Sequence, residues 1–131
     1  MTYRIFEKPI IILDSDIDEN GHVNNISYLK WVQDIAIAHW NSVATSEMKA
    51  QLSWVVSRHE IDYLKSAFLN SNLMAKTWVT NPQGAKSDRF VEIIDMNNNT
   101  TITKIKTTWY LLDAVTKRPK RIDSEITRVF E

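Results

Sequence analysis

An uninterrupted helical pattern over residues 25–40 is the feature that most restricts how this chain can fold. Its apolar residues recur at intervals of three or four: Leu29, Val32, Ala36 and Trp40. The run contains neither glycine nor proline, and Asn24 or Asn25 is suited to cap its first turn. A helix with one apolar stripe needs a second layer over that stripe, so the rest of the chain must supply it.

After residue 50 the chain changes to segments rich in β-branched and aromatic residues, separated by polar turns. Four strands are predicted here: residues 52–64, 73–81, 88–96 and 101–113. In the last of them Ile105, Trp109 and Leu111 share one face, while Lys104 and Lys106 share the other. This alternation is typical of a sheet with one side on a core and the other side in water.

Two shorter elements complete the pattern. Residues 3–13 predict a first strand, in which Pro9 indicates an edge or a bulge, and residues 123–131 predict a short closing helix. The order of one strand, one long helix and four strands indicates an α+β fold, with the helix packed on an antiparallel sheet. The length of 131 residues fits one domain, residues 1–131.

Composition excludes several functional classes. Sixteen basic and sixteen acidic residues cancel, so no overall field attracts nucleic acid or an anionic membrane. Without cysteine the chain has no thiol nucleophile and no cysteine metal site, and its three histidines lack the spacing of a zinc site. The sequence shows no signal peptide and no membrane-spanning run, so we expect a soluble, cytoplasmic protein without a metal or cofactor.

The polar turn before the helix, residues 14–24, allows several interpretations. From Asp16 the pattern D-x-D-x-N-G matches the first half of an EF-hand calcium loop. The twelfth position of that loop should be a bidentate Glu, whereas this chain has Ser27. A strand-like segment also stands where the entering helix belongs. A calcium-binding module at residues 16–27 is therefore an alternative and not our main interpretation.

A structural interpretation of the same turn is simpler. Asp and Asn side chains hydrogen-bond the local backbone in turns, and a carboxylate near a helix N-terminus is stabilised by the exposed N–H groups. We adopt this interpretation for Asp14 and Asp16. The remaining acidic residue of the turn, Asp18, has a further interpretation that depends on a family resemblance.

The segment DIDENGHVNNISYLKW, residues 16–31, resembles the signature of hotdog-fold acyl-CoA thioesterases. It is most similar to the 4-hydroxybenzoyl-CoA thioesterase-like family, whose members often carry D-x-D-x-x-G-H-V-N-N-x-x-Y. Residues 55–67 resemble the second strand of that family, and residues 117–119 resemble its late basic loop. The resemblance implies an α+β hotdog fold, in which an antiparallel sheet wraps around one long central helix.

The same resemblance implies the catalytic roles. Asp18 would be the carboxylate that either attacks the thioester carbonyl or activates a water molecule as general base. The backbone N–H of Asn25 would polarise the carbonyl, since the first turn of a helix offers free donors and a partial positive charge. Gly21 would allow a positive φ or a close approach to the ligand, although an ordinary Asn-Gly turn explains it equally well.

Substrate contacts are expected close to this turn and on a few cations. His22 and Val23 would form the wall of the site, and Asn24 would orient the substrate or cap the helix. Coenzyme A carries phosphates, and several basic residues are candidates to bind them: Arg89, Lys117 and Arg118, with Lys86, Lys120 and Arg121 nearby. The alternative for each of these is a solvated surface charge.

The resemblance also implies the partners. The substrate would be an acyl-CoA or an acyl-carrier protein, and the active site would lie between the protomers of a homodimer, which can pair into a tetramer. A non-catalytic or dehydratase-like acyl-binding hotdog domain remains the alternative. The carboxylate of Asp18 favours hydrolysis over hydration.

Overall fold

The computed structural model describes residues 3–131. Its elements in chain order are β1 (Phe6–Pro9), the 3-10 turn η1 (Asp14–Asp16), α1 (Asn25–Val43), α2 (Ser46–Gln51), β2 (Leu52–Tyr63), β3 (Leu73–Val79), β4 (Lys86–Asp95), β5 (Thr100–Asp113) and α3 (Ser124–Arg128). The predicted order of strand, long helix and four strands is confirmed. The four later strands begin and end within two residues of their predicted bounds.

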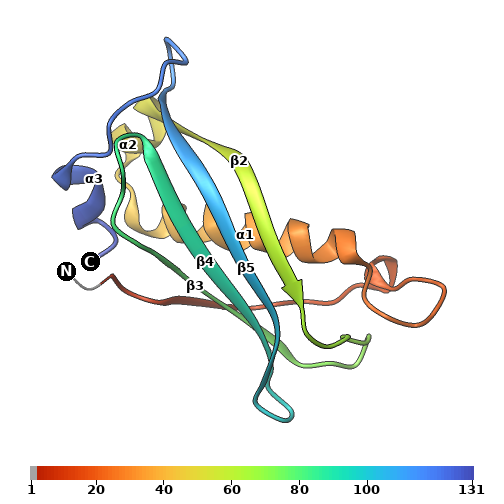
Figure 1. The fold of residues 1–131 in the computed structure, drawn as a ribbon. Helices are drawn as coiled ribbons and strands as arrows, with labels where there is room; N and C mark the ends of the chain where they lie inside the picture. Colours follow the sequence, from red (N-terminus) through yellow and green to blue (C-terminus); the bar gives the residue numbers. More distant parts are fainter. Residues whose placement is uncertain (1–2) are drawn as a thin grey trace.

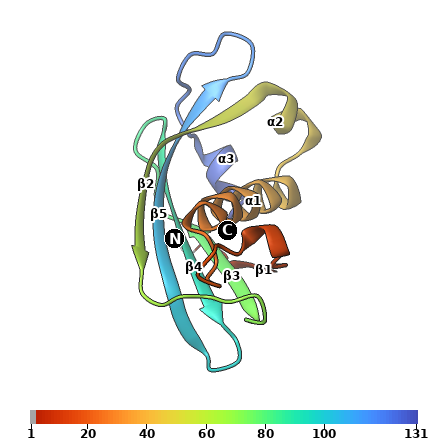
Figure 2. The ribbon, with the colours of Figure 1, turned by 90° about the vertical axis from the view of Figure 1, so that its right-hand side faces the viewer.

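The five strands form one antiparallel sheet in the order β1-β3-β4-β5-β2 (Figure 1). The sheet curves around α1, which lies against its concave face (Figure 2). The α+β hotdog architecture is therefore confirmed. The two edges of the sheet are β1 and β2, and Pro9 lies in the edge strand β1, as its lack of an N–H requires.

The core lies between α1 and the concave face. Val32 and Ile35 of α1 are fully buried there against Val91 and Ile93 of β4 and Ile105 of β5. Burying a side chain of this size contributes roughly 2 kcal/mol, so the apolar stripe of the helix holds it on the sheet. The alternation of buried and accessible residues along β4 and β5 confirms which side of each strand faces the helix.

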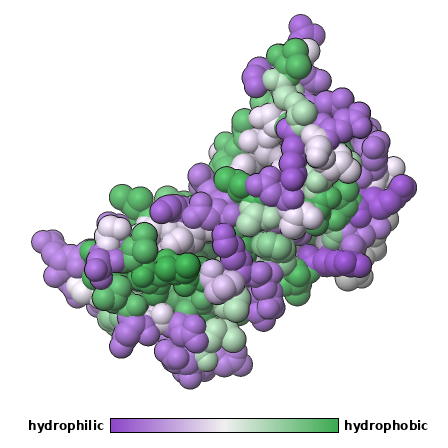
Figure 3. Space-filling model, turned by 180° about the vertical axis from the view of Figure 1, so that it is seen from behind, coloured by the Kyte–Doolittle hydropathy of each residue, from purple (hydrophilic) through white to green (hydrophobic). Residues whose placement is uncertain are grey.

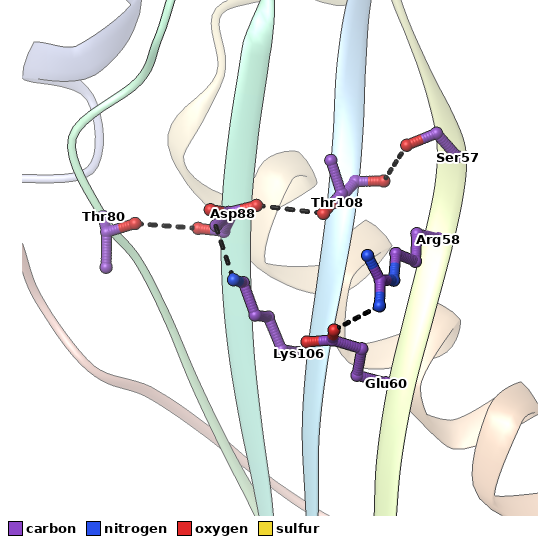
Figure 4. A network of polar contacts seen from close by, with 7 residues as sticks. All are labelled: Ser57, Arg58, Glu60, Thr80, Asp88, Lys106 and Thr108. Atoms are coloured by element: carbon purple, nitrogen blue, oxygen red, sulfur yellow. Dashed lines mark hydrogen bonds and ion pairs between the residues drawn. The ribbon is translucent and has the colours of Figure 1, made fainter.

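The opposite face of β4, β5 and β2 carries a network of polar side chains (Figure 4). Asp88 accepts a hydrogen bond from the Thr108 hydroxyl at 3.0 Å and lies 3.8 Å from Lys106 Nζ. Further along, Arg58 pairs with Glu60 at 2.7 Å. These side chains suit a solvated surface. The chemistry of the chain is therefore to be sought on the helix side of the sheet.

Two local differences from the sequence-based expectation have simple causes. The first strand is only four residues long. Its last backbone bond to β3 comes from Ile10 N–H to Leu73 O at 3.0 Å, and the chain then turns away. The helix α2 was not predicted, because Met48 is its only buried residue and gives no apolar period. None of the helices within residues 3–131 combines the length and apolar character needed to cross a bilayer.

Candidate functional site

The turn between β1 and α1 is built around Asp16. Its side chain is buried, with Oδ2 accepting from the Leu13 N–H at 2.8 Å and Oδ1 accepting from the Ser27 hydroxyl at 2.8 Å. The Asn24 N–H donates to the Asp16 carbonyl at 2.7 Å. The structural interpretation of Asp16 is confirmed, because it ties the turn to the first turn of the helix.

The calcium interpretation does not match this geometry. Both carboxylate oxygens of Asp16 are engaged by the protein, and a strand and a 3-10 turn stand in place of the entering helix. Within residues 3–131, no group of three or more His, Asp or Glu side chains is placed to hold a metal ion. The segment therefore differs from an EF-hand loop in both its ligands and its flanking structure.

Asp18 closes the tip of the same turn. Its Oδ1 accepts from the backbone N–H groups of Asn20 at 2.9 Å and His22 at 3.0 Å. Gly21 has φ of +79°, which a residue with a side chain adopts only with strain, and no atom lies near the place of its missing Cβ. Gly21 therefore serves the turn rather than a close contact with the protein. Among the described residues, the hydrogen bonds to the Asp18 side chain all go to Oδ1.

The helix N-terminus lies directly after this turn. Asn24 is the N-cap, because its Oδ1 accepts from the Ile26 N–H at 3.1 Å. Asn25 is the first helical residue, and within residues 3–131 its N–H meets no acceptor. An unbonded N–H at the positive end of a helix of 19 residues is a donor for negative charge. The sequence expectation that Asn24 caps the helix is confirmed.

A pocket of about 220 Å³, here called the Asp18 pocket, joins these groups. It is lined by Asp18, His22, Val23, Asn25, Tyr28 and residues 63–66. Burial raises the pKa of the Tyr28 hydroxyl, which therefore stays a proton donor at neutral pH. Four of the predicted residues, Asp18, His22, Val23 and Asn25, thus line one pocket, although the side chain of Val23 packs in the core. Gly21 and Asn24 do not line it, and Asn24 is occupied as a cap.

The far wall of the Asp18 pocket comes from a part of the chain that sequence reasoning did not assign to the site. Tyr63 ends β2 and packs edge-on against Tyr28, with ring centroids 5.4 Å apart. The loop after it is fixed to the turn by a hydrogen bond from the Val23 N–H to the Ala67 carbonyl at 2.8 Å. A local sequence pattern carries no information about contacts such as Tyr28 with Tyr63 or Val23 with Ala67. This wall of the pocket could therefore be identified only from the three-dimensional structure.

The predicted phosphate-binding cations lie elsewhere in the single chain. Lys117 and Arg118 are exposed in the loop after β5, beside the Leu52 end of β2, whereas the Asp18 pocket adjoins the Tyr63 end. The two ends of β2 are roughly 35 Å apart for a strand of this length. In Figure 1 the loop, in blue at the top, and the turn, in orange at the right, lie at different ends of the molecule.

Arg89 is a correction to the sequence-based expectation. It was expected to meet phosphate at the surface, but its residue is only 5% exposed. Its Nη1 donates to His39 Nδ1 at 2.9 Å and to the Thr77 hydroxyl at 3.0 Å. Ser87, Arg89 and Val91 have the same parity along β4, so the alternation of the strand turns Arg89 inward. The position of Arg89 in this alternation was the feature of the sequence from which its burial could have been predicted.

The surroundings of Arg89 set the charge states in this cluster. Burial lowers the pKa of Arg89 to about 10, so its guanidinium stays charged at neutral pH. Burial and the neighbouring guanidinium lower the pKa of His39 to about 4. His39 is therefore neutral and accepts the hydrogen bond from Arg89 through Nδ1.

Arg89 also lines a second and larger cavity, which has a volume of about 600 Å³ and is called the tryptophan cavity. It lies between the second half of α1 and the first half of β2, and three indoles contribute to its wall: Trp40, Trp54 and Trp109. The residues predicted for catalysis are not part of it. The two hollows are therefore separate in one chain, and β2 contributes to both.

Comparison with known proteins gives one family match. Residues 4–130 match the sequence profile of the family described as the acyl-ACP thioesterase N-terminal domain. A search among curated protein sequences finds no match. The family match covers nearly the whole chain, including the turn, the long helix and all five strands.

Solved structures resemble the fold closely at low sequence identity. A 1,4-dihydroxy-2-naphthoyl-CoA thioesterase from Synechocystis has a TM-score of 0.83 at 11% identity, covering 97% of this chain and 96% of that chain. A thioesterase from Thermus thermophilus, complexed with coenzyme A and Zn, has a TM-score of 0.82 at 18% identity, covering 95% of this chain and 90% of that chain. These similarities show a shared fold.

A 12:0-ACP thioesterase from Umbellularia californica is also similar, with a TM-score of 0.81 at 18% identity. The match covers 97% of this chain but only 54% of that chain. The present chain therefore spans about half the length of that protein.

Proposed function

The chain belongs to the family of the acyl-ACP thioesterase N-terminal domain, a family of thioester hydrolases, and from that premise we propose that it hydrolyses an acyl thioester to a free acid and a thiol. The acyl carrier would be coenzyme A or an acyl-carrier protein. The observation that carries the proposal is the Asp18 pocket, where a carboxylate and the unbonded N–H of Asn25 line the same small hollow.

In the proposed reaction the thioester carbonyl oxygen points to the Asn25 N–H. Negative charge develops on that oxygen as the carbonyl is attacked, and a fixed donor at a helix N-terminus stabilises it. Asp18 has Oδ1 held by two backbone N–H groups, which leaves Oδ2 to act. This carboxylate supplies either the attacking oxygen or the base that removes a proton from water.

Both roles consume one water molecule. As nucleophile, Asp18 forms a bond to the carbonyl carbon, the C–S bond breaks, and water then cleaves the resulting mixed anhydride. As general base, Asp18 takes a proton from a water molecule that attacks the carbonyl directly, and the thiolate leaves and is protonated. Release of free thiol is the common readout.

The test is the Asp18→Asn substitution. Asn keeps an oxygen that accepts the N–H bonds of the turn but can neither attack nor take a proton, so kcat should fall by about 100-fold or more. Thiol release from a panel of acyl-CoA substrates measures the effect. Asp14→Asn, an exposed residue of the same turn, is the matched control and should leave turnover unchanged. Near-normal kcat in the Asp18 variant would remove Asp18 from the proposed role.

We further propose that two copies of the chain associate through β2. It is an edge strand of 12 residues, so its outer backbone N–H and C=O groups are free to pair with another strand. Antiparallel pairing of two β2 strands about a two-fold axis sets the Leu52 end of one copy beside the Tyr63 end of the other. The tryptophan cavity of one copy would then adjoin the Asp18 pocket of its partner.

The proposed dimer would bring the exposed residues Lys117 and Arg118 to the substrate. Lys117 and Arg118 follow Asp113, which pairs with Leu52 at one end of β2. In the proposed dimer that loop approaches the partner's Asp18 pocket, where the phosphates of coenzyme A would emerge. Association of such dimers into a tetramer would cover further apolar surface on the helix side (Figure 3). Ile11 and Ile26 are 79% and 71% exposed in one chain.

A further inference from the structure

Arg89 is a buried cation without a carboxylate partner. The ion pairs within residues 3–131 involve Arg58, Lys76 and Lys106 but not Arg89. Its two hydrogen bonds both start at Nη1 and end on neutral groups of His39 and Thr77. Removing a guanidinium from water without an anion is unfavourable, so buried cations in proteins normally have one.

The tryptophan cavity, which Arg89 lines, contains a second polar group that lacks a partner. Trp109 lines the same cavity, and its indole Nε1–H is buried and makes no hydrogen bond with any described residue. Buried indole N–H groups normally find an acceptor. Two residues that line one cavity, Arg89 and Trp109, thus have hydrogen-bonding capacity that the described part of the chain does not use.

The remaining wall of the cavity is largely apolar. Its aromatic and aliphatic members are Trp40, Trp54, Val56, Val79 and Phe130. Aromatic walls around a few fixed polar groups are typical of a site for a small organic ligand, and about 600 Å³ is within the usual range of such sites. The occupant should therefore be mostly apolar, with an oxygen acceptor where it reaches Arg89.

The position of Arg89 sets the length of that occupant. Arg89 is on β4 and Trp109 on β5, while residues 52–56 of the edge strand β2 also line the cavity, so Arg89 is two strands in from that edge of the sheet. At about 4.8 Å per strand this is roughly 10 Å, the length of an extended chain of about six to eight carbons. In the proposed dimer the same edge adjoins the partner's Asp18 pocket.

We propose that the tryptophan cavity binds the acyl group and selects one with a carboxylate at its far end, so that the substrate is the monothioester of a dicarboxylic acid of about six to eight carbons. This inference rests on the proposed thioesterase function. The distal carboxylate accepts from Arg89, the Trp109 N–H donates to an oxygen of the same group, and the methylene chain packs on the aromatic wall. The thioester then extends past the edge of β2.

Matched pairs of thioesters test the selection directly. We expect kcat/KM for adipoyl-CoA to exceed that for hexanoyl-CoA at least tenfold, and suberoyl-CoA to exceed octanoyl-CoA similarly, because a charge-assisted hydrogen bond in an apolar site is strong. Equal values, or a preference for the plain acyl chains, overturn the proposed selection while the thioesterase function stands.

Two variants assign the preference to the named donors. Arg89→Met keeps an unbranched side chain without charge and should abolish the preference for adipoyl-CoA over hexanoyl-CoA. Trp109→Phe removes only the N–H and should reduce the preference severalfold. Arg128→Gln, at an exposed arginine of α3, is the matched control and should change neither rate. A preference that survives in both Arg89→Met and Trp109→Phe overturns the assignment.

A binding measurement separates this inference from the thioesterase function. Isothermal titration calorimetry of the whole chain with hexanoate and with hexanamide needs no turnover, and only hexanoate carries a carboxylate. Hexanoate should bind at least tenfold more tightly than hexanamide, and Arg89→Met should abolish the difference. If hexanoate binds in this way but no thioester is hydrolysed, the cavity is assigned and the thioesterase function fails. If hexanoate binds no better than hexanamide, the proposed recognition of a carboxylate is wrong.

Discussion

At the level of single residues, Gly21 and Gly84 share a backbone conformation but not a location. Both have positive φ, +79° and +62°, and neither has any atom near the position of a missing Cβ. Gly21 lies in the turn that holds Asp18, whereas Gly84 lies in the connection between β3 and β4. Substituting each glycine in turn therefore separates the backbone strain caused by an added side chain from the effect of that side chain on the Asp18 pocket.

We expect Gly21→Ala and Gly84→Ala each to lower the free energy of unfolding by about 1 kcal/mol, because an L-residue is strained at positive φ. Only Gly21→Ala should also lower kcat/KM, since the backbone N–H groups that hold Asp18 Oδ1 belong to its turn. Urea denaturation and thiol release measure the two effects. An equal loss of activity in both variants would contradict a special role for the Gly21 turn.

At the level of elements, the contact between α1 and β4 depends on a histidine. His39 of α1 is 2% exposed, is stacked on Phe6 with ring centroids 4.9 Å apart, and accepts from Arg89 of β4. Its pKa is about 4, below the ordinary value of 6.5, because of burial and the nearby guanidinium. As the pH falls below 6.5 the unfolded chain gains a proton that the folded chain excludes, so stability decreases until the pH reaches about 4.

The expected size of this loss between pH 7 and pH 5 is about 2 kcal/mol in the free energy of unfolding. Urea denaturation at the two pH values measures it for the wild-type chain. His39→Gln keeps an acceptor for Arg89 but cannot be protonated, and should therefore lack this part of the pH dependence. The same slope in both proteins would show that His39 is not its source.

The elements themselves could largely be predicted from sequence. The long helix follows from its apolar period, and β2 to β5 follow from their alternation. The residue types after Asp18 were also enough to predict that Asn24 caps the long helix and that the turn leads directly into that helix. What could not be predicted depends on contacts between distant segments. Tyr63 lines the same pocket as Asp18, and His39 bonds to Arg89, only because the sheet curves around the helix.

At the level of the whole molecule, the two ends of β2 carry different parts of the proposed site. The Asp18 pocket adjoins the Tyr63 end, and Lys117 and Arg118 follow the residue that pairs with Leu52 at the other end. In one chain these groups are too far apart to hold one substrate. A two-fold axis across β2 would unite them, with each copy supplying the phosphate-binding loop of the other.

Mixing two defective variants tests this arrangement. Asp18→Asn lacks the carboxylate, and a double variant, Lys117→Ala with Arg118→Ala, lacks the cations. Random pairing after co-expression should give heterodimers with one wholly intact site, so about a quarter of wild-type activity should return at low substrate concentration. If each loop served its own chain, no intact site would form and activity would stay at the level of the unmixed variants. Light scattering reports the dimer independently.

The unequal edges of the sheet have a consequence for how far association can proceed. β1 offers only four residues, and its last, Pro9, has no hydrogen on nitrogen to give to a neighbour. A strand from another copy can therefore form a long hydrogen-bonded ladder with β2 but not with β1. When two copies pair through β2, the β2 edge of each copy is used. In the proposed dimer, growth by strand pairing would therefore end at two copies, so a long exposed edge strand can serve self-association without seeding fibrils.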